Sequence, residues 1–350
     1  MSPIDRRAFL ACGAAWAVSA HVLRRSSGAQ DHRPDRVVPE FVQPETGNVI
    51  REGLDFLAER QNEEGCFGTE GYRRNVAVVS LAGLAFMANG SAPGRGPYGR
   101  HVNRCLSFVL KHAREDGFIV VPGSSSHGPM YEHGFATLFL AEAHGMYRDS
   151  NLREALARAA SLIAATQNQE GGWRYRPERH DADISVTICQ VMALRAARNA
   201  GIFVSNETID RCTDYVKQCQ NPDGGFAYML PREESRFPRT AAGIVALYSA
   251  GIYEGDEIRR GLEYLMKHKP EIGSVNVDDH FFYGHYYAVQ ATWLAGGAYW
   301  REWYPAIRKV LLARRREDGS WFDQICPEYG TAMACMILQM PNNYLPIFER

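Results

Sequence analysis

Carboxyl and imidazole groups stand at the edges of strongly apolar segments in this 350-residue sequence. Asp181 and Asp183 come directly before an apolar segment at 184–194, and His133 and His285 lie near the starts of two others. A carboxyl group among apolar residues stays protonated more readily, because burial disfavours its charged form. A nearby carboxylate or imidazole can share that proton and restore it afterwards. The candidates for general acid chemistry are therefore Asp183, Asp181, His133 and His285.

Aromatic and basic side chains recur at the same edges. An aromatic-lined apolar well suits an isoprenoid, because the faces of aromatic rings stabilise carbocations. Polar groups that converge on an apolar hollow are also the usual composition of a ligand site. The expected ligand is an apolar small molecule, either an isoprenoid or another lipid. The candidates for substrate binding are Tyr131, Arg239, Tyr283, Tyr286, Tyr329 and Trp173.

Each candidate also has a purely structural interpretation. Asp181 and Asp183 can serve only as helix caps, because acidic residues at a helix start interact favourably with the helix dipole. Arg236 and Arg239 can pair with these aspartates as salt bridges. The histidines and aromatic residues can be ordinary core residues that take no part in chemistry. The sequence leaves both interpretations open.

One short motif recurs along the chain, in which a glycine turn follows polar residues and precedes an aromatic residue. Its first four glycines, Gly65, Gly117, Gly171 and Gly224, lie 52, 54 and 53 residues apart. The next, Gly319, follows 95 residues later, which is about two further periods. A degraded copy is therefore expected at 269–273. The spacing predicts six units of roughly 50 residues each.

Each unit is predicted to contain two helices. An amphipathic segment precedes each turn, such as 152–163 or 209–219, with its charges on the opposite face. A second segment follows the turn and is apolar on nearly all sides, which is typical of a helix buried on every side. These apolar segments are 76–88, 135–143, 184–194, 240–247, 286–293 and 331–338.

The alternation of amphipathic and apolar helices predicts two concentric rings, with the apolar helices inside. An open solenoid of helix pairs is the alternative, although its wet concave face would carry more charge than these segments do. All inner helices should start at the same end of the barrel, because every unit runs in the same direction. Their first residues should therefore converge on one mouth. The predicted fold class is all-α, an α6/α6 toroid made of six helix pairs.

The repeated Gln-x-x-x-Gly-x-Trp/Phe pattern resembles the QW motif of squalene and oxidosqualene cyclases. It is also similar to the repeat of protein prenyltransferase β-subunits. The resemblance covers about residues 48–340, and its five evenly spaced copies make it specific. It implies an α6/α6 toroid with an active site at one mouth of the inner ring. In that superfamily the motif is structural and ties outer helices to the next inner ones.

A second resemblance concerns the acidic residues themselves. Residues 180–187, His-Asp-Ala-Asp-Ile-Ser-Val-Thr, resemble the D-x-D-D-T-A element of class II terpene cyclases. By position, the resemblance implies that Asp183 is the proton-donating aspartate and Asp181 the first aspartate. Ile184 replaces the third aspartate, whose carboxyl group helps to orient the acidic proton. The implied chemistry is protonation of an alkene or epoxide, followed by cyclisation or rearrangement in a dry pocket.

The metal-dependent branch of the same superfamily fits less well. The Asp-x-Cys zinc pair of protein prenyltransferases is missing, and Thr331 stands near the position of their zinc-binding histidine. The sequence also lacks a D-D-x-x-D motif for a magnesium-bound diphosphate. Neither a metal nor another cofactor is therefore expected.

Composition narrows the range of partners. A formal net charge of −1, without long runs of like charge, argues against nucleic acid as the main partner. No apolar run is long enough to predict a transmembrane segment. The cysteines beyond Cys12 show no regular spacing, so we expect them to behave as small buried hydrophobic residues. The sequence indicates no particular oligomeric state.

The N-terminal residues predict export. Arg6 and Arg7 precede a weakly apolar run at 9–20, which is typical of a Tat-type signal peptide. An ordinary Arg-rich tail is the alternative. The predicted organisation is a signal peptide at 1–29, a linker at 30–47 and a prenyltransferase/squalene cyclase-like toroid domain at 48–350. The predicted location is the periplasm or the cell envelope.

Three hypotheses for function follow. The first is an isoprenoid- or lipid-handling enzyme of the terpene cyclase or prenyltransferase type, with acid-initiated chemistry at the mouth of the barrel. The second is a non-catalytic exported toroid that binds a peptide, glycan or lipid there. The third is a polysaccharide-cleaving α/α barrel with paired carboxylates. The enzyme hypothesis requires a deep apolar cavity, whereas the binding hypothesis predicts a shallow or filled barrel with its aspartates engaged in caps and ion pairs.

Overall fold

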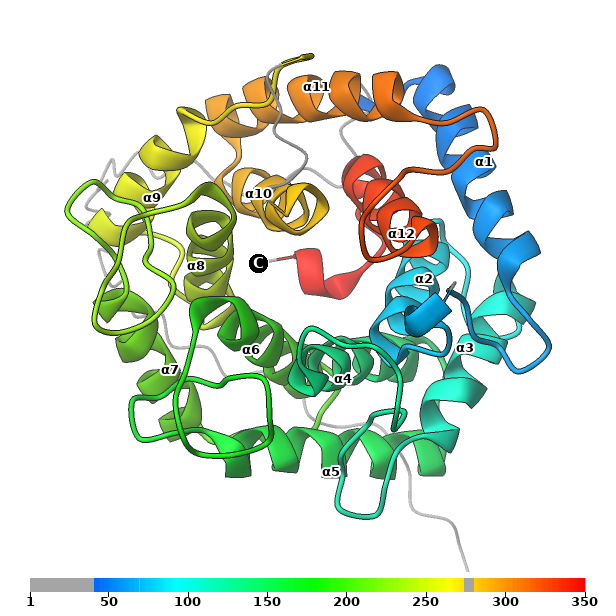
Figure 1. Ribbon diagram of the computed structural model, residues 1–350, viewed down its shortest axis with the longest axis horizontal. Helices are drawn as coiled ribbons and strands as arrows, with labels where there is room; N and C mark the ends of the chain where they lie inside the picture. The colour runs from blue at the N-terminus through cyan, green and yellow to red at the C-terminus, as the bar shows by residue number, and fades with distance from the viewer. Residues whose placement is uncertain (1–40, 69, 274–279, 350) are drawn as a thin grey trace, which may run out of the picture. The chain divides into compact units, whose positions relative to one another are not determined.

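The computed structural model describes residues 41–68, 70–273 and 280–349, which form one compact unit (Figure 1). The first helix begins at Pro44, slightly before the predicted start of the toroid domain. The predicted signal peptide and most of the predicted linker lie outside the described residues.

Twelve α-helices within the described residues form two concentric rings (Figure 1). The outer helices are α1 (Pro44–Arg60), α3 (Gly99–Lys111), α5 (Ser150–Thr166), α7 (Asn206–Gln218), α9 (Asp256–Met266) and α11 (Gly297–Arg314). The inner helices are α2 (Val76–Ala88), α4 (Pro129–Met146), α6 (Ile184–Asn199), α8 (Phe237–Ser249), α10 (Phe281–Ala295) and α12 (Pro327–Leu338). Each inner helix packs against the next, and α12 packs against α2 to close the ring. The predicted α6/α6 toroid is confirmed, and the open solenoid is excluded.

The side-chain pattern of each helix explains its place in the two rings. The inner helix α2 buries almost every residue, as its apolar sequence predicts. The outer helix α3 buries one face only, with Val102, Leu106 and Val109 at helical spacing. The seven cysteines in the described part of the chain are free and buried, as expected of small hydrophobic residues.

The repeated motif fixes the contact between neighbouring units. The side-chain amide of Gln167 donates to the carbonyl oxygens of Gly171, at 2.8 Å, and of Thr208 in the next outer helix, at 2.9 Å. The backbone N–H of Trp173 donates to the hydroxyl of Thr187 in the inner helix α6, at 3.1 Å. Each turn therefore ties one outer helix both to the next outer helix and to the following inner helix.

The glycine in each of these turns adopts a left-handed conformation that side chains disfavour. Gly171 has a φ of +101°, and a Cβ atom there would lie 2.1 Å from the carbonyl oxygen of Arg211. Gly273, in the predicted degraded copy, has a φ of +89° but would place its Cβ atom in open space. The degraded turn has kept the backbone conformation without the close contact to a neighbouring helix.

The C-terminal segment closes the end of the barrel where the inner helices finish (Figure 1). It contains the short 3₁₀ helices η3 (Met340–Asn342) and η4 (Pro346–Phe348). The indole N–H of Trp293 donates to the carbonyl oxygen of Phe348 at 3.2 Å, and Arg195 donates to that of Glu349. Any opening into the barrel must therefore lie at the other end, where the inner helices start.

The helices themselves are not of a membrane-spanning kind. Across the described residues, none is long and apolar enough to cross a bilayer.

Candidate functional site

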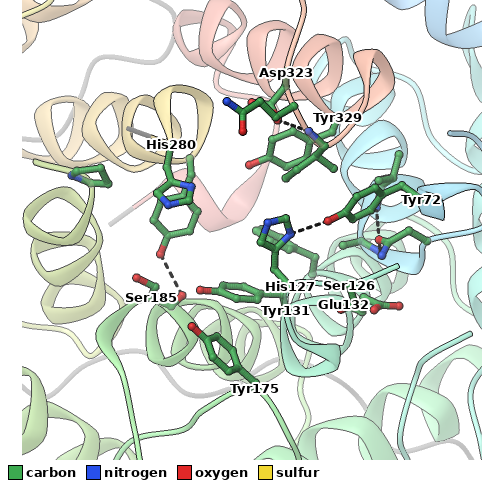
Figure 2. Close-up of a pocket in the computed structure, with 18 of the residues that line it drawn as sticks. Tyr72, Ser126, His127, Tyr131, Glu132, Tyr175, Ser185, His280, Asp323 and Tyr329 are labelled. Carbon is green, nitrogen blue, oxygen red and sulfur yellow. Dashed lines mark hydrogen bonds between the residues drawn. The ribbon is translucent and has the colours of Figure 1, made fainter. Parts of the chain in front are cut away.

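A cavity of about 540 Å³ opens at the starts of the inner helices (Figure 2). This volume lies within the range of about 300–1,000 Å³ that small-molecule sites usually have. Its apolar surface comes from residues such as Val78, Phe135 and Ile325, and its polar groups stand among them. The described titratable residues that line it are Tyr72, His127, Tyr131, Glu132, Tyr175, Tyr228, Arg236, Arg239, His280, Tyr283, Asp323 and Tyr329.

Every helix pair contributes one tyrosine to this cavity. Tyr131, Tyr283 and Tyr329 are each the third residue of their inner helix. Tyr175 and Tyr228 each follow the aromatic residue of a repeat turn by two positions. The sixth, Tyr72, ends the short 3₁₀ helix η2 (Glu70–Tyr72) before α2. The repeat thus produces a ring of phenol groups around one hollow.

Four of the predicted substrate-binding residues line the cavity: Tyr131, Arg239, Tyr283 and Tyr329. Two do not belong to the lining set. Tyr286 is buried against Phe135, with ring centroids 6.4 Å apart. Trp173 is buried in the repeat turn, where its indole N–H donates to the carbonyl oxygen of Ile163 at 2.7 Å.

Asp183 is fully buried as the N-cap of α6. Its Oδ1 atom accepts a hydrogen bond from the backbone N–H of Val186 at 2.9 Å. Its Oδ2 atom is also buried and meets hydrogen-bonding geometry with no group in the described part of the chain. Burial raises the pKa of this carboxyl from 3.8 to about 6, although the Val186 N–H, Arg174 and Tyr228 favour its charged form. The cavity wall beside Asp183 is formed by Tyr228, which the cavity does reach.

Asp181 is half-exposed and forms an ion pair with Arg174, at 2.5 Å. The Nε atom of the same guanidinium lies 3.8 Å from Oδ2 of Asp183, so Arg174 spans both aspartates. The sequence had suggested Arg236 and Arg239 as partners of these aspartates. Arg236 instead bonds to Glu234, at 2.5 Å, and Arg239 lies 3.9 Å from Glu233.

The two candidate histidines lie between the rings, away from the cavity. His133 accepts from the backbone N–H of Ile119 and donates to the carbonyl oxygen of Ala159, both at 3.2 Å. His285 packs among Phe237, Phe281 and Trp303. Burial lowers the pKa of His133 to about 4 and that of His285 to about 3.

Helix geometry explains where these histidines point. Each follows a cavity-lining tyrosine, Tyr131 or Tyr283, by two positions. Two residues along an α-helix correspond to a rotation of about 200°, so the histidine faces the outer ring. Both histidines are therefore neutral and are contacted mainly by core groups.

Several lining residues were not among the sequence candidates. Glu132 follows Tyr131 and lines the cavity, and burial raises the pKa of its carboxyl to about 7. His127 and Asp323 come from loops before α4 and α12, where no helical period predicts a direction. Burial also raises the pKa of Asp323, while His280 and His127 oppose that rise. Only the helix starts could have been placed from sequence.

Two family models match the chain. The squalene-hopene cyclase C-terminal domain matches residues 135–286, and the prenyltransferase alpha-alpha toroid domain matches residues 47–158. Together the matches cover ten of the twelve helices or parts of them, from α1 to the start of α10.

Curated relatives share these matches over part of their length. Drimenyl diphosphate synthase of Streptomyces showdoensis is 28% identical over 180 residues, which are 51% of this chain and 32% of that protein. Protostadienol synthase A of Arthroderma gypseum is 26% identical over 143 residues, which are 38% of this chain and 19% of that protein. The matched segment thus spans about a third or less of these relatives.

Solved structures share the fold over nearly their full length. The type II terpene cyclase MstE from Scytonema has a TM-score of 0.58 at 17% identity, over 86% of this chain and 98% of that one. An α-1,6-mannanase of a Salegentibacter species has a TM-score of 0.62 at 8% identity, over 85% and 99%. At these identities the likeness concerns the fold alone.

Proposed function

This chain belongs to the terpenoid cyclase and prenyltransferase superfamily, and from that premise we propose that it cyclises or rearranges a linear isoprenoid by protonating it. The observation that carries the proposal is the tyrosine-lined cavity beside a buried aspartate whose pKa is raised to about 6. An acid that is protonated in mildly acidic solution, next to an aromatic hollow, supplies both the proton and a surface for the cation.

The proposed proton donor is Asp183, acting with Tyr228. The Oδ2 atom of Asp183 is buried without a hydrogen-bond partner in the described residues, so its proton is not held by another group. The hydroxyl of Tyr228 is close enough to favour the charged form of Asp183, and it also contacts the hydroxyl of Tyr175. A proton from Asp183 can reach an alkene through Tyr228, which Asp183 then reprotonates.

The tyrosine ring supplies the environment for the cation that forms. Tyr131, Tyr283 and Tyr329 lie around the hollow, and burial raises the pKa of each phenol well above its ordinary value. They remain neutral and present aromatic faces, which attract a cation without capturing it covalently. The hydroxyl of Tyr283 donates to the carbonyl oxygen of Ser185 at 3.0 Å, which fixes its ring in place.

The relatives support an isoprenoid with a polar end. One curated relative is named for a terpenoid diphosphate, and MstE has been solved with geranylgeranyl dihydroxybenzoate as substrate. In this chain, Arg236 and Arg239 stand at the cavity and can hold an anionic end near the mouth. The apolar chain would then extend among the tyrosines.

The test is turnover by the purified full chain of farnesyl diphosphate, farnesol and geranylgeraniol, with products identified by gas chromatography and mass spectrometry. Asp183→Asn keeps the helix cap, because asparagine is also a good N-cap, but removes the acidic proton. We expect cyclised products from the wild type and a loss of at least about 100-fold in the variant. Asp210→Asn, on the exposed face of α7, is the matched control and should be unaffected.

A second candidate function is supported by the engaged aspartates. Asp183 caps α6 and Asp181 pairs with Arg174, as a protein that only binds its ligand would require. Such a protein would retain an isoprenoid in native mass spectrometry without converting it, and Asp183→Asn would retain it equally. Conversion of a bound isoprenoid by the wild type alone would exclude this candidate.

A further inference from the structure

A reaction that begins with protonation and ends in an alkene also needs a group that takes a proton away. His127 lines the cavity, and its Nδ1 atom lies 2.7 Å from the hydroxyl oxygen of Tyr72 (Figure 2). The two rings also stack, with centroids 5.9 Å apart. His127 therefore has a fixed partner for one ring nitrogen, while Nε2 is available to a ligand.

The loop that carries His127 is tied to the loop before α2. The backbone N–H of Ser125 donates to the carbonyl oxygen of Gly71 at 2.8 Å, and the amide of Asn75 donates to that of Ser125 at 2.9 Å. These two bonds flank the contact between His127 and Tyr72. The imidazole is thus positioned by three interactions between segments about fifty residues apart.

This group stands apart from the proposed acid. Tyr72 and Asp323 lie across the cavity from Tyr175, which borders Tyr228 and the acid (Figure 2). The Asp323 carboxyl interacts electrostatically with both His127 and His280, so its negative charge would stabilise an imidazolium at His127. Each ring closure moves a cation away from the point of protonation, so the acceptor belongs on the far side.

We propose that His127 accepts the proton that ends the reaction, with Tyr72 as the residue that positions it; this inference rests on the proposed function. The Nδ1–H of His127 donates to the oxygen of Tyr72, which leaves the lone pair of Nε2 free. His127 is exposed at the mouth, so its proton can pass to water afterwards.

The proton balance is closed. Asp183 and Tyr228 add one proton to a C=C bond, and neighbouring alkenes then form new C–C bonds while the positive charge moves along the chain. A C–H bond beside the last cationic carbon breaks, and its electron pair forms the new C=C bond. The released proton binds Nε2 of His127 and then leaves to water, while Asp183 regains a proton from solvent. The net reaction is an isomerisation.

The test is the ratio of alkene to alcohol among the products formed from the same three isoprenoid probes. Without an acceptor, water at the mouth captures the cation, so His127→Asn should raise the alcohol share about tenfold or more while substrate consumption falls less than about tenfold. Tyr72→Phe keeps the stacked ring and should shift the ratio in the same direction. His268→Asn, on the outer helix side, is the control.

The outcomes separate the two proposals. An unchanged alkene product from His127→Asn overturns the role of His127 and leaves the cyclase proposal standing. If that variant does not fold, as judged by its thermal midpoint, the Tyr72→Phe ratio decides instead. A wild-type chain that converts none of the probes overturns the proposed function, and this inference with it.

Discussion

At the scale of single residues, the account depends on a carboxyl group whose two oxygen atoms have different tasks. One oxygen of Asp183 caps α6, and the other is left for chemistry. The neighbouring guanidinium of Arg174 weakens the acid but does not cancel the effect of burial. The pH dependence of turnover should therefore report the state of Asp183.

We predict that turnover falls as the pH rises through about 6. The pKa of Asp183 is raised from 3.8 to about 6, so its proton is present below that pH and is lost above it. Arg174→Gln removes a charge that favours the ionised form, and should move this decline to higher pH. Initial rates between pH 4.5 and 8 check both expectations. A profile that is flat across this range would exclude Asp183 as the acid.

Glu142 provides a second prediction at this scale. It is buried near the C-terminal segment, and burial raises the pKa of its carboxyl from 4.5 to about 8. The folded chain therefore binds this proton more tightly than the unfolded chain, and stability is lost as the pH rises from 4.5 to about 8. Glu142→Gln should be more stable than wild type at pH 8, by on the order of 2 kcal/mol, and this advantage should shrink toward pH 5. Urea unfolding at both values measures it.

Helix starts and loops differ in how far the sequence predicts their residues. The third residue of an inner helix faces the cavity, which explains why Tyr131, Tyr283 and Tyr329 could be selected from the pattern. The same period sends His133 and His285 to the opposite side, which the choice of residues by proximity alone overlooked. His127 reaches the cavity only through contacts with a distant loop, so no local signal marks it.

At the scale of elements, the repeat turns hold neighbouring helices together. Gly171→Ala should destabilise the chain by about 2–4 kcal/mol, because the left-handed backbone is strained by a side chain and the new Cβ meets a carbonyl oxygen at 2.1 Å. Gly201→Ala is the matched control, since its φ is +82° but its Cβ would lie in open space. It should cost only about 1 kcal/mol. Equal losses in thermal stability would show that the turn contact contributes nothing.

The helices were predictable because their apolar period and turn glycines repeat. The sequence indicated six units from five visible turns, and the structure contains the sixth helix pair where the degraded copy was expected. The partner of each turn was less accessible to prediction, because it lies in the next outer helix. Gln167 shows this, since its amide bonds to Thr208, 41 residues away.

At the scale of the whole toroid, the C-terminal segment makes the barrel one-ended. Its apolar sequence indicated packing, but only the structure shows that it crosses the ring near Trp293 and Arg195. Phe348 is buried there, whereas Tyr344 in the same segment is exposed. Phe348→Ala should cost about 3 kcal/mol of stability, and Tyr344→Ala less than about 1 kcal/mol. Calorimetric midpoints that drop equally would show that the segment does not close the barrel.

The central claim is that an isoprenoid occupies the hollow at the starts of the inner helices. Photocrosslinking with a benzophenone ether of farnesol, followed by peptide mapping, tests it most directly. The account predicts labelling of peptides that contain Tyr131, Tyr283 or Tyr329, and loss of that labelling when geranylgeraniol competes. Labelling confined to the outer helices, or labelling that geranylgeraniol does not reduce, would contradict it.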